Sequence, residues 1–251
     1  MGKSDIRIVG TMNANDAYYL KRILESHNYQ GYGEKPEYTV DLAHSGFVSG
    51  NKSKYGDYGI CDVRNDFLPS VYTNEVPSGV FTSNKYLLKV TLPEDIKAIN
   101  ASAFSHCVSL GKINIPSSCM EIGSQAFSSC TSLTNVDFPY ISQEIALPQL
   151  QTISEGAFSN IGRLKSFVLP ESLRLVATTA LSFYVDRLFS LTDEPPVWEV
   201  PGNAGYVIGP KPDGCTLYVP FGCSEAYKSS EKWSQFKIEE MPEDKWWEMI
   251  P

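Results

Sequence analysis

A stretch of twelve residues occurs twice in this chain, 23 residues apart. Residues 99–110 read INASAFSHCVSL and residues 122–133 read IGSQAFSSCTSL, with seven of the twelve letters identical. Both stretches belong to full units of 23 residues, which begin at Leu92-Pro93 and Ile115-Pro116. A unit of this size cannot bury its apolar side alone, so neighbouring units must stack and share one continuous core. The repeat therefore predicts a solenoid.

Further units in the same register lie on both sides of this pair. One begins at Phe138 and is eight residues longer, with the extra length in YISQEIALPQLQ at 140–151. The next begins at Leu169 and has Leu181 where the others have Phe, and residues 76–90 fit as a degenerate unit upstream. Four or five copies at one period are a strong indication of a repeat architecture.

Each unit contains an apolar pattern that predicts a short strand. Leu110, Ile113 and Ile115 follow the form L-x-x-L-x-L, and the final alternation is typical of a strand with one buried face. We expect these strands to align in parallel at a spacing of about 4.8 Å. The Ala-Phe segment is expected to form a turn of α-helix or 3₁₀-helix on the opposite side, with Ala103 permitting close approach and Phe104 filling the core.

The unit resembles the bacterial BspA-type leucine-rich repeat, whose signature runs LP-x-x-[apolar]-x-x-I-x-x-x-AF-x-x-C-x-x-L-x-x-I. The resemblance covers residues 68–192. It implies an α/β fold, a leucine-rich repeat solenoid of short parallel strands with helical or 3₁₀ turns on the opposite side, capped at both ends. It also implies a Bacteroides-like protein that is secreted or held at the cell surface, with a signal peptide removed upstream of Met1.

Residues 1–67 resemble the N-terminal cap and first atypical repeats of such proteins. IRIVGTMNANDAYYLKRIL is expected to form a strand, a loop and a helix, followed by a strand in YTVDLAHSGFV. Asn15-Asp16 offers an N-cap for the helix. One apolar stripe indicates its buried face, formed by Ala17, Leu20, Ile23 and Leu24.

Residues 193–251 resemble the segment that closes the other end of the solenoid. Thr216–Val219 alternates as a strand does, and 224–233 is expected to be helical, with Ser224 as N-cap and Tyr227 facing inward. This segment holds 5 basic and 11 acidic residues, which accounts for nearly all of the excess acidity. A polar outer surface is what the terminal unit of a solenoid requires.

The cysteines are predicted to serve in packing rather than in chemistry. Cys107 and Cys130 occupy the same slot in successive units, where later units have Ile161 and Tyr184, so we expect an apolar, inward position. Cys119 also replaces an apolar residue. Two disulfides remain open alternatives because their formation depends on geometry, namely Cys107–Cys130 and Cys215–Cys223.

Composition and motifs exclude several classes of function. The net charge is −8 and no basic run exists, which argues against nucleic-acid binding, and no apolar stretch is long enough to span a membrane. Asp57, Asp62 and Asp66 lack the spacing of a calcium-binding loop, and no phosphate-binding glycine motif is present. His44-Ser45 invites a hydrolase interpretation, but the nucleophile-elbow motif G-x-S-x-G is missing. We therefore expect no catalytic residues, no metal and no cofactor.

The remaining candidate for function is a surface. The outward positions of the predicted strands form two rows of mainly polar residues on an extended concave face, and we take these rows as the candidate binding residues: Lys89, Lys112, Asn135 and Ser166 in one row, and Thr91, Asn114, Asp137 and Val168 in the other. The favoured function is a monomeric, non-enzymatic module that binds a protein or glycan partner. A structural spacer without a ligand is the alternative, and a hydrolase using the segment from His44 to Asp66 is a third, less favoured class. The insertion at 140–151 is a second candidate region.

Overall fold

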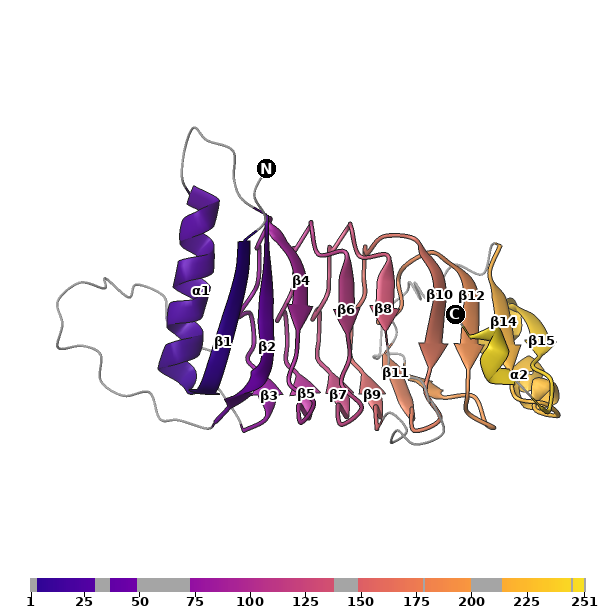
Figure 1. The fold of residues 1–251 in the computed structure, drawn as a ribbon. Coiled ribbons are helices and arrows are strands. Elements are labelled where there is room, and N and C mark those ends of the chain that lie inside the picture. The colour runs from indigo at the N-terminus through magenta and orange to yellow at the C-terminus, as the bar shows by residue number, and fades with distance from the viewer. Residues whose placement is uncertain are drawn as a thin grey trace.

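The structure, a computed structural model, describes residues 4–29, 37–48, 73–137, 149–177, 179–199, 214–244 and 246–250. Figure 1 shows short strands standing side by side along the long axis of the molecule, with the N-terminal helix at one end and the C-terminal elements at the other. The elements in chain order are β1 (Ser4–Met12), α1 (Ala14–Tyr29), β2 (Tyr38–Phe47), β3 (Glu75–Val76), β4 (Leu87–Thr91), β5 (Ala98–Ile99), β6 (Lys112–Asn114), β7 (Glu121–Ile122), β8 (Asn135–Asp137), β9 (Thr152–Ile153), β10 (Leu164–Leu169), β11 (Leu175–Ala177), β12 (Val185–Ser190), β13 (Val197–Glu199), β14 (Thr216–Val219), α2 (Ser224–Ser229), the 3₁₀ turn η2 (Trp233–Gln235), β15 (Lys237–Glu240) and the 3₁₀ turn η3 (Trp246–Met249).

The strands form three parallel sheets on two sides of the stack. The order β1-β2-β4-β6-β8 is continued by β10-β12-β14-β15, and we call these two sheets together the sheet side. The third sheet, β13-β11-β9-β7-β5-β3, forms the short-strand side. Every strand pairing in the described ranges is parallel. One rung, meaning one turn of the chain around the core, contributes a strand to each side, which confirms the predicted stacking of repeats.

The Ala-Phe segments form a third side, which we call the turn side. Within a rung the amide of Ser105 donates to the Ser102 carbonyl at 3.1 Å, the i→i−3 bond expected of a 3₁₀ turn. Between rungs the amide of Phe104 donates to the Ala126 carbonyl at 2.7 Å, so the turns are bonded to one another as strands are. Ser102 and His106 have positive φ values of 56° and 60°. These left-handed residues interrupt helical geometry, so each segment is a series of turns.

A column of phenylalanine rings runs along the inside of the turn side. Phe81, Phe104, Phe127 and Phe158 are fully buried, and their ring centroids follow one another at 4.9, 5.2 and 5.1 Å with nearly parallel planes. The preceding small residues, Ala103 and its equivalents, are buried as well. The identical letters of the repeat thus fill identical space in each rung, as predicted.

The N-terminal residues form the expected strand, helix and strand, but the helix begins earlier than predicted. Asn13 caps α1 instead of Asn15-Asp16, because the Asp16 amide donates to Asn13 Oδ1 at 3.3 Å and the Asn13 amide donates to Asp16 Oδ2 at 2.9 Å. This reciprocal pair is a capping box. Most of the predicted stripe packs into the core, whereas Ile23 is 53% exposed.

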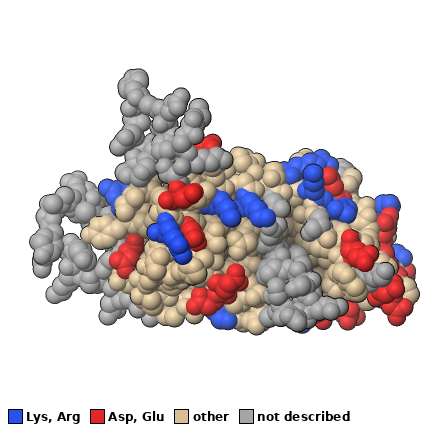
Figure 2. Space-filling model, in the orientation of Figure 1, with Lys and Arg blue, Asp and Glu red and all other residues tan. Residues whose placement is uncertain are grey.

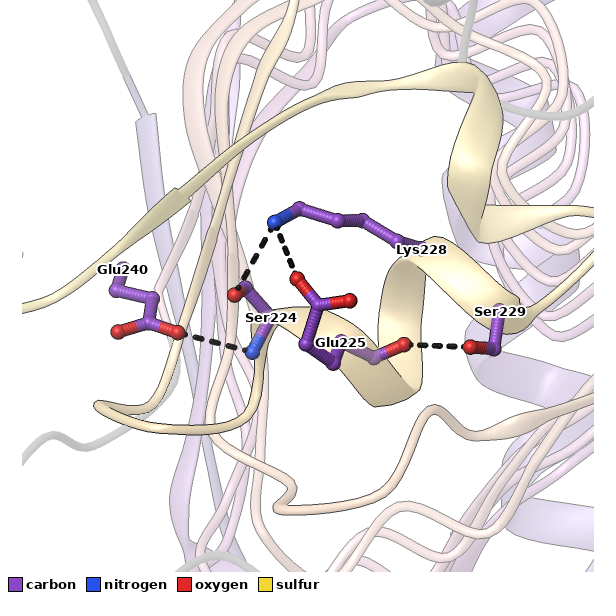
Figure 3. Close-up of polar contacts among 5 residues, drawn as sticks. All are labelled: Ser224, Glu225, Lys228, Ser229 and Glu240. Atoms are coloured by element: carbon purple, nitrogen blue, oxygen red, sulfur yellow. Dashed lines mark hydrogen bonds and ion pairs between the residues drawn. The ribbon is translucent and has the colours of Figure 1, made fainter.

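The C-terminal residues continue the sheet side and then cover its end. β14 forms as predicted, but α2 spans only six residues, and η2 follows it after a break. Ser224 is the first helical residue rather than the N-cap, and its amide donates to Glu240 Oε1 at 3.1 Å (Figure 3). Within α2, Lys228 Nζ contacts both Ser224 Oγ and Glu225 Oε1, so the bond from Ser224 to Glu240 is the contact in Figure 3 that joins α2 to β15.

Buried hydrogen bonds attach α2 and η2 to the last rung. The Tyr227 hydroxyl, which is buried as predicted, contacts Ser190 Oγ at 2.8 Å and Thr192 Oγ1 at 2.6 Å, and donates to the Thr192 carbonyl at 2.8 Å. Trp233 Nε1 donates to the Pro196 carbonyl at 3.0 Å. Aromatic side chains with satisfied polar ends thus close the core where the repeats stop. Neither helix in the described ranges combines the length and apolarity of a membrane crossing.

Candidate functional site

Strand register brings part of each predicted row together on the sheet side. Lys89 pairs with Lys112, and Lys112 pairs with Asn135. In the neighbouring row Asn114 pairs with Asp137. The side chains of Asn135 and Asp137 lie outside the described part of the chain, so their placement rests on the backbone alone. Parallel pairing places neighbouring residues of a row about 4.8 Å apart.

The central part of the sheet side is polar and accessible. Lys89 and Lys112 are exposed, and Thr91, Asn114 and Ser166 are partly exposed. Figure 2 shows a short row of basic side chains over the central strands, with acidic side chains beside it towards the N-terminal end and a further group at the end that holds α2 and β15. In a protein of net charge −8, Lys89 and Lys112 therefore form a short, local basic strip.

The sequence predicts that Val168 faces solvent, and the structure shows that it is buried. Its side chain is only 5% exposed and packs with Phe189 and Met241. The register Val168↔Phe189↔Tyr218 shows that the row does point away from the main core. Residues from the C-terminal end of the chain cover the row at Val168. The side chain of Thr91 therefore faces solvent, whereas that of Val168 faces an apolar contact.

The rows continue beyond Val168 into residues that sequence reasoning missed. Ser166 pairs with Arg187, and Phe189 stacks on Tyr218 with ring centroids 5.0 Å apart. The Arg187 guanidinium lies 5.6 Å from the Phe189 ring centroid. The signal for these residues is present in VDRLFS at 185–190 and TLYV at 216–219, which alternate as the earlier strands do. Arginine and tyrosine are typical of interface hot spots.

The chain's own C-terminal segment covers this aromatic extension. Trp246, Met249 and Ile250 pack against the small cluster formed by Val168, Phe189 and Met241. Arg187 Nη1 donates to the Met249 carbonyl at 3.4 Å, which ties the segment to the row. The sheet side is therefore polar and accessible over β4 and β6, whereas the C-terminal segment covers it over β10, β12 and β14.

Cys107, Cys119 and Cys130 lie in the core, where the packing interpretation places them. All three are fully buried free thiols, and burial raises the pKa of Cys119 to about 12. Cys107 Sγ donates to the Phe81 carbonyl and Cys130 Sγ to the Phe104 carbonyl, each at 3.0 Å. These thiols therefore bond each rung to the preceding one, a role that an apolar slot did not predict.

The second candidate disulfide is likewise absent in the described residues. Cys215 and Cys223 are free thiols, the first buried and the second partly exposed. Burial raises the pKa of Cys215 to about 11. The slot shared by Cys107 and Cys130 is not inward in every rung, since Tyr184 in the same register is 46% exposed.

The remaining predicted sites gain no support as chemical centres. His44 is exposed, and the buried Ser45 hydroxyl donates to the Leu42 carbonyl at 2.9 Å, which engages it in a local turn. Asp57, Asp62 and Asp66 lie outside the described residues, as does most of the insertion, from 140 to 148. Within the described ranges no group of His, Cys, Asp or Glu could hold a metal ion.

The match to a protein family agrees with this architecture. The family model for the BspA-type leucine-rich repeat region matches residues 59–184 with six copies. A crystal structure of a leucine-rich repeat protein from Bacteroides ovatus ATCC 8483 is similar to the chain, with a TM-score of 0.45 and 17% sequence identity over 65% of this chain. The matched part spans 39% of that protein. No curated protein matches the sequence.

Proposed function

Because the chain belongs to the BspA-type leucine-rich repeat family, we propose that it is a non-enzymatic binding module, secreted or held at the cell surface, which recognises a protein or glycan partner through the sheet side. The surface location is what the family resemblance supports. Within this proposal, residues 1–67 and 193–251 cap the repeats of 68–192, and the module acts as a monomer.

The observation that carries the proposal is the accessible polar surface over β4 and β6. Lys89 and Lys112, both exposed, stand next to each other in one row. A partner with acidic or hydrogen-bond-accepting groups is complementary to two neighbouring ammonium groups.

The experiment is an array of glycans and host proteins probed with the labelled chain. We expect at least one specific hit, and we expect the combined variant Lys89→Ala, Lys112→Ala, Asn114→Ala and Asp137→Ala to lose it while unfolding at the same denaturant concentration as the parent. A matched control carries Lys97→Ala and Glu121→Ala on the short-strand side, where both residues are exposed, and should retain the hit.

Three results would count against a non-enzymatic module that binds through the sheet side. If no component of the array binds, the result favours the alternative that the chain is a structural spacer without a ligand. If a hit survives the combined sheet-side variant and is lost in the short-strand control, binding takes place on another side of the stack. Hydrolysis of an array component by the chain would contradict the non-enzymatic assignment, and His44→Ala would then be the first variant to assay.

A further inference from the structure

A hollow of about 480 Å³ lies on the turn side, away from the rows of the sheet side. This volume falls in the range of about 300–1,000 Å³ that is typical of small-molecule sites. It spans three successive rungs, those of Phe127, Phe158 and Leu181. The residues that line it are Gln125, Glu155, Gly156, Ser159, Asn160, Ile161, Thr179, Ser182, Phe183 and Tyr184.

One origin of the hollow is a missing side chain. The residue that precedes Ala-Phe in each rung is Ser102, Gln125, Gly156 and then Thr179. A Cβ atom built on Gly156 would lie 3.4 Å from Gln125 Cγ and 3.9 Å from Thr179 Oγ1. The glycine, whose φ is +65°, therefore leaves space for about one methyl group between the side chains of the rungs before and after it.

The second origin is a change in how the Leu181 rung fills the core. Leu181 does not extend the column of stacked rings, and Phe183 takes over that space: it is 3% exposed and meets the rings of Phe158 and Phe167 at 6.4 and 5.3 Å with interplanar angles of 75° and 62°. Tyr184, next in the chain, is 46% exposed and lines the hollow. An accessible aromatic ring thus stands at the point where the repeat pattern breaks.

The polar groups of the lining are mostly oriented as hydrogen-bond acceptors. Ser159 Oγ donates to Ser128 Oγ at 2.9 Å, so the lone pairs of the Ser159 oxygen can accept, and Ser182 Oγ donates to the Thr179 carbonyl at 3.0 Å. Asn160 donates through Nδ2 to Ser129 Oγ at 3.3 Å, which leaves its Oδ1 as an acceptor. The exposed Glu155 adds a carboxylate.

This lining suits a ligand with many hydroxyl donors and one apolar face. Aromatic side chains provide flat apolar surface with a polar edge, and carboxylate or amide oxygens accept hydroxyl protons in charge-assisted or neutral hydrogen bonds. Neither Lys nor Arg is among the described residues that line the hollow, and Glu155 contributes a negative charge. An anionic ligand would meet repulsion without a compensating cation.

We propose that the hollow between Gly156 and Tyr184 is a binding site for a neutral saccharide, which packs the apolar face of one sugar ring on Tyr184 and donates hydroxyl hydrogen bonds to Glu155 and Asn160. The site is independent of the proposed function, since it uses other residues on another side of the stack. Partner binding on the sheet side and saccharide binding on the turn side succeed or fail separately.

The test measures binding of maltotriose, cellotriose, lactose and N,N′-diacetylchitobiose to the full chain by saturation-transfer NMR and calorimetry, with trigalacturonate as the anionic probe. We expect saturable binding of at least one neutral saccharide. Tyr184→Ala should weaken it at least about tenfold, Glu155→Gln should weaken it about fivefold, and Tyr184→Phe, which keeps the ring, should stay within about twofold. The pair Lys89→Ala and Lys112→Ala should leave it unchanged.

Three outcomes would overturn the proposal. The first is that none of the four neutral saccharides binds the folded chain at millimolar concentration, and the second is that trigalacturonate binds more tightly than all of them. The third is binding that neither Tyr184→Ala nor Glu155→Gln weakens. Because Tyr184 and Glu155 are both exposed, both variants should fold, and circular dichroism of each variant verifies this before affinities are compared.

Discussion

Replacing Phe127 by alanine tests the stacked core at its centre. The ring is fully buried, and its centroid lies 5.2 Å from that of Phe104 and 5.1 Å from that of Phe158. Truncating a buried phenylalanine to alanine costs about 3–5 kcal/mol through lost transfer free energy and the cavity left behind. We expect a loss at the upper end of this range, because both stacked pairs, worth about 0.5–1.5 kcal/mol each, disappear with one ring.

Two matched variants show whether this loss belongs to the ring column. Phe127→Leu keeps most of the apolar volume and copies Leu181 of a later rung, so it should cost about 1–2 kcal/mol. Ser129→Ala, in the same turn but only partly buried, should stay within about 0.5 kcal/mol.

The assay is unfolding in urea, monitored by tryptophan fluorescence and by far-ultraviolet circular dichroism. The free energies of unfolding are compared between variants whose dependence on urea concentration, the m-value, is unchanged. Equal losses for Phe127→Ala and Ser129→Ala would show that the register of the repeat is misassigned. A loss below about 1 kcal/mol for Phe127→Ala would show that the rings do not carry the core.

Four further predictions concern the closed end of the stack and the Cys107 thiol. Tyr227→Phe should lower the free energy of unfolding by about 1–3 kcal/mol, since it leaves Ser190 and Thr192 with one partner fewer. Burial raises the pKa of Tyr227 to about 12. The parent chain should therefore keep its full stability below the ordinary tyrosine pKa near 10 and lose stability as the pH rises from 10 towards 12. Tyr227→Phe should lose less stability over the same pH range, measured by unfolding at each pH. Burial also holds the pKa of the Cys107 thiol well above its usual value, so mass spectrometry should find Cys107 unmodified by iodoacetamide at pH 8 until the chain is unfolded, and rapid native alkylation would contradict its placement. Removing residues 242–251 should uncover Phe189 and increase the fluorescence of an added apolar dye such as ANS, and an unchanged signal would show that this segment does not cover the sheet side.

The positions predicted best from the sequence are those whose environment recurs in every rung. Phe104 and Cys107 repeat because each rung offers the same space, so a register taken from letters alone places them correctly in the core. Their finer contacts were not predictable in the same way. The hydrogen bond from the Cys107 thiol to the Phe81 carbonyl depends on how two rungs are offset, and the left-handed conformation of Ser102 and Gln125 occurs in residue types that have no preference for it.

The predictions failed where one part of the chain depends on a distant part. Val168 has the register of an outward residue, and only the packing of residues some 70 positions later buries it. Tyr184 occupies an inward slot by alignment, yet Phe183 takes the core position because Leu181 supplies no ring. In both cases the residues that compensate for each other are not separated by the repeat length, so the repeat pattern cannot predict the contact. Both positions lie beside the surfaces to which we assign binding.

Lysine footprinting of the chain, with and without the partner that the array identifies, measures directly whether the sheet side binds that partner. Acetylation under limiting reagent is quantified by mass spectrometry at Lys89 and Lys112, and at Lys97 and Lys228, which are exposed on other parts of the surface. We expect the partner to slow modification of Lys89 and Lys112 several-fold and to leave the modification rates of Lys97 and Lys228 unchanged. Equal rates at Lys89 and Lys112 in the free and bound chain, with protection confined to Lys97 or Lys228, would contradict binding through the sheet side.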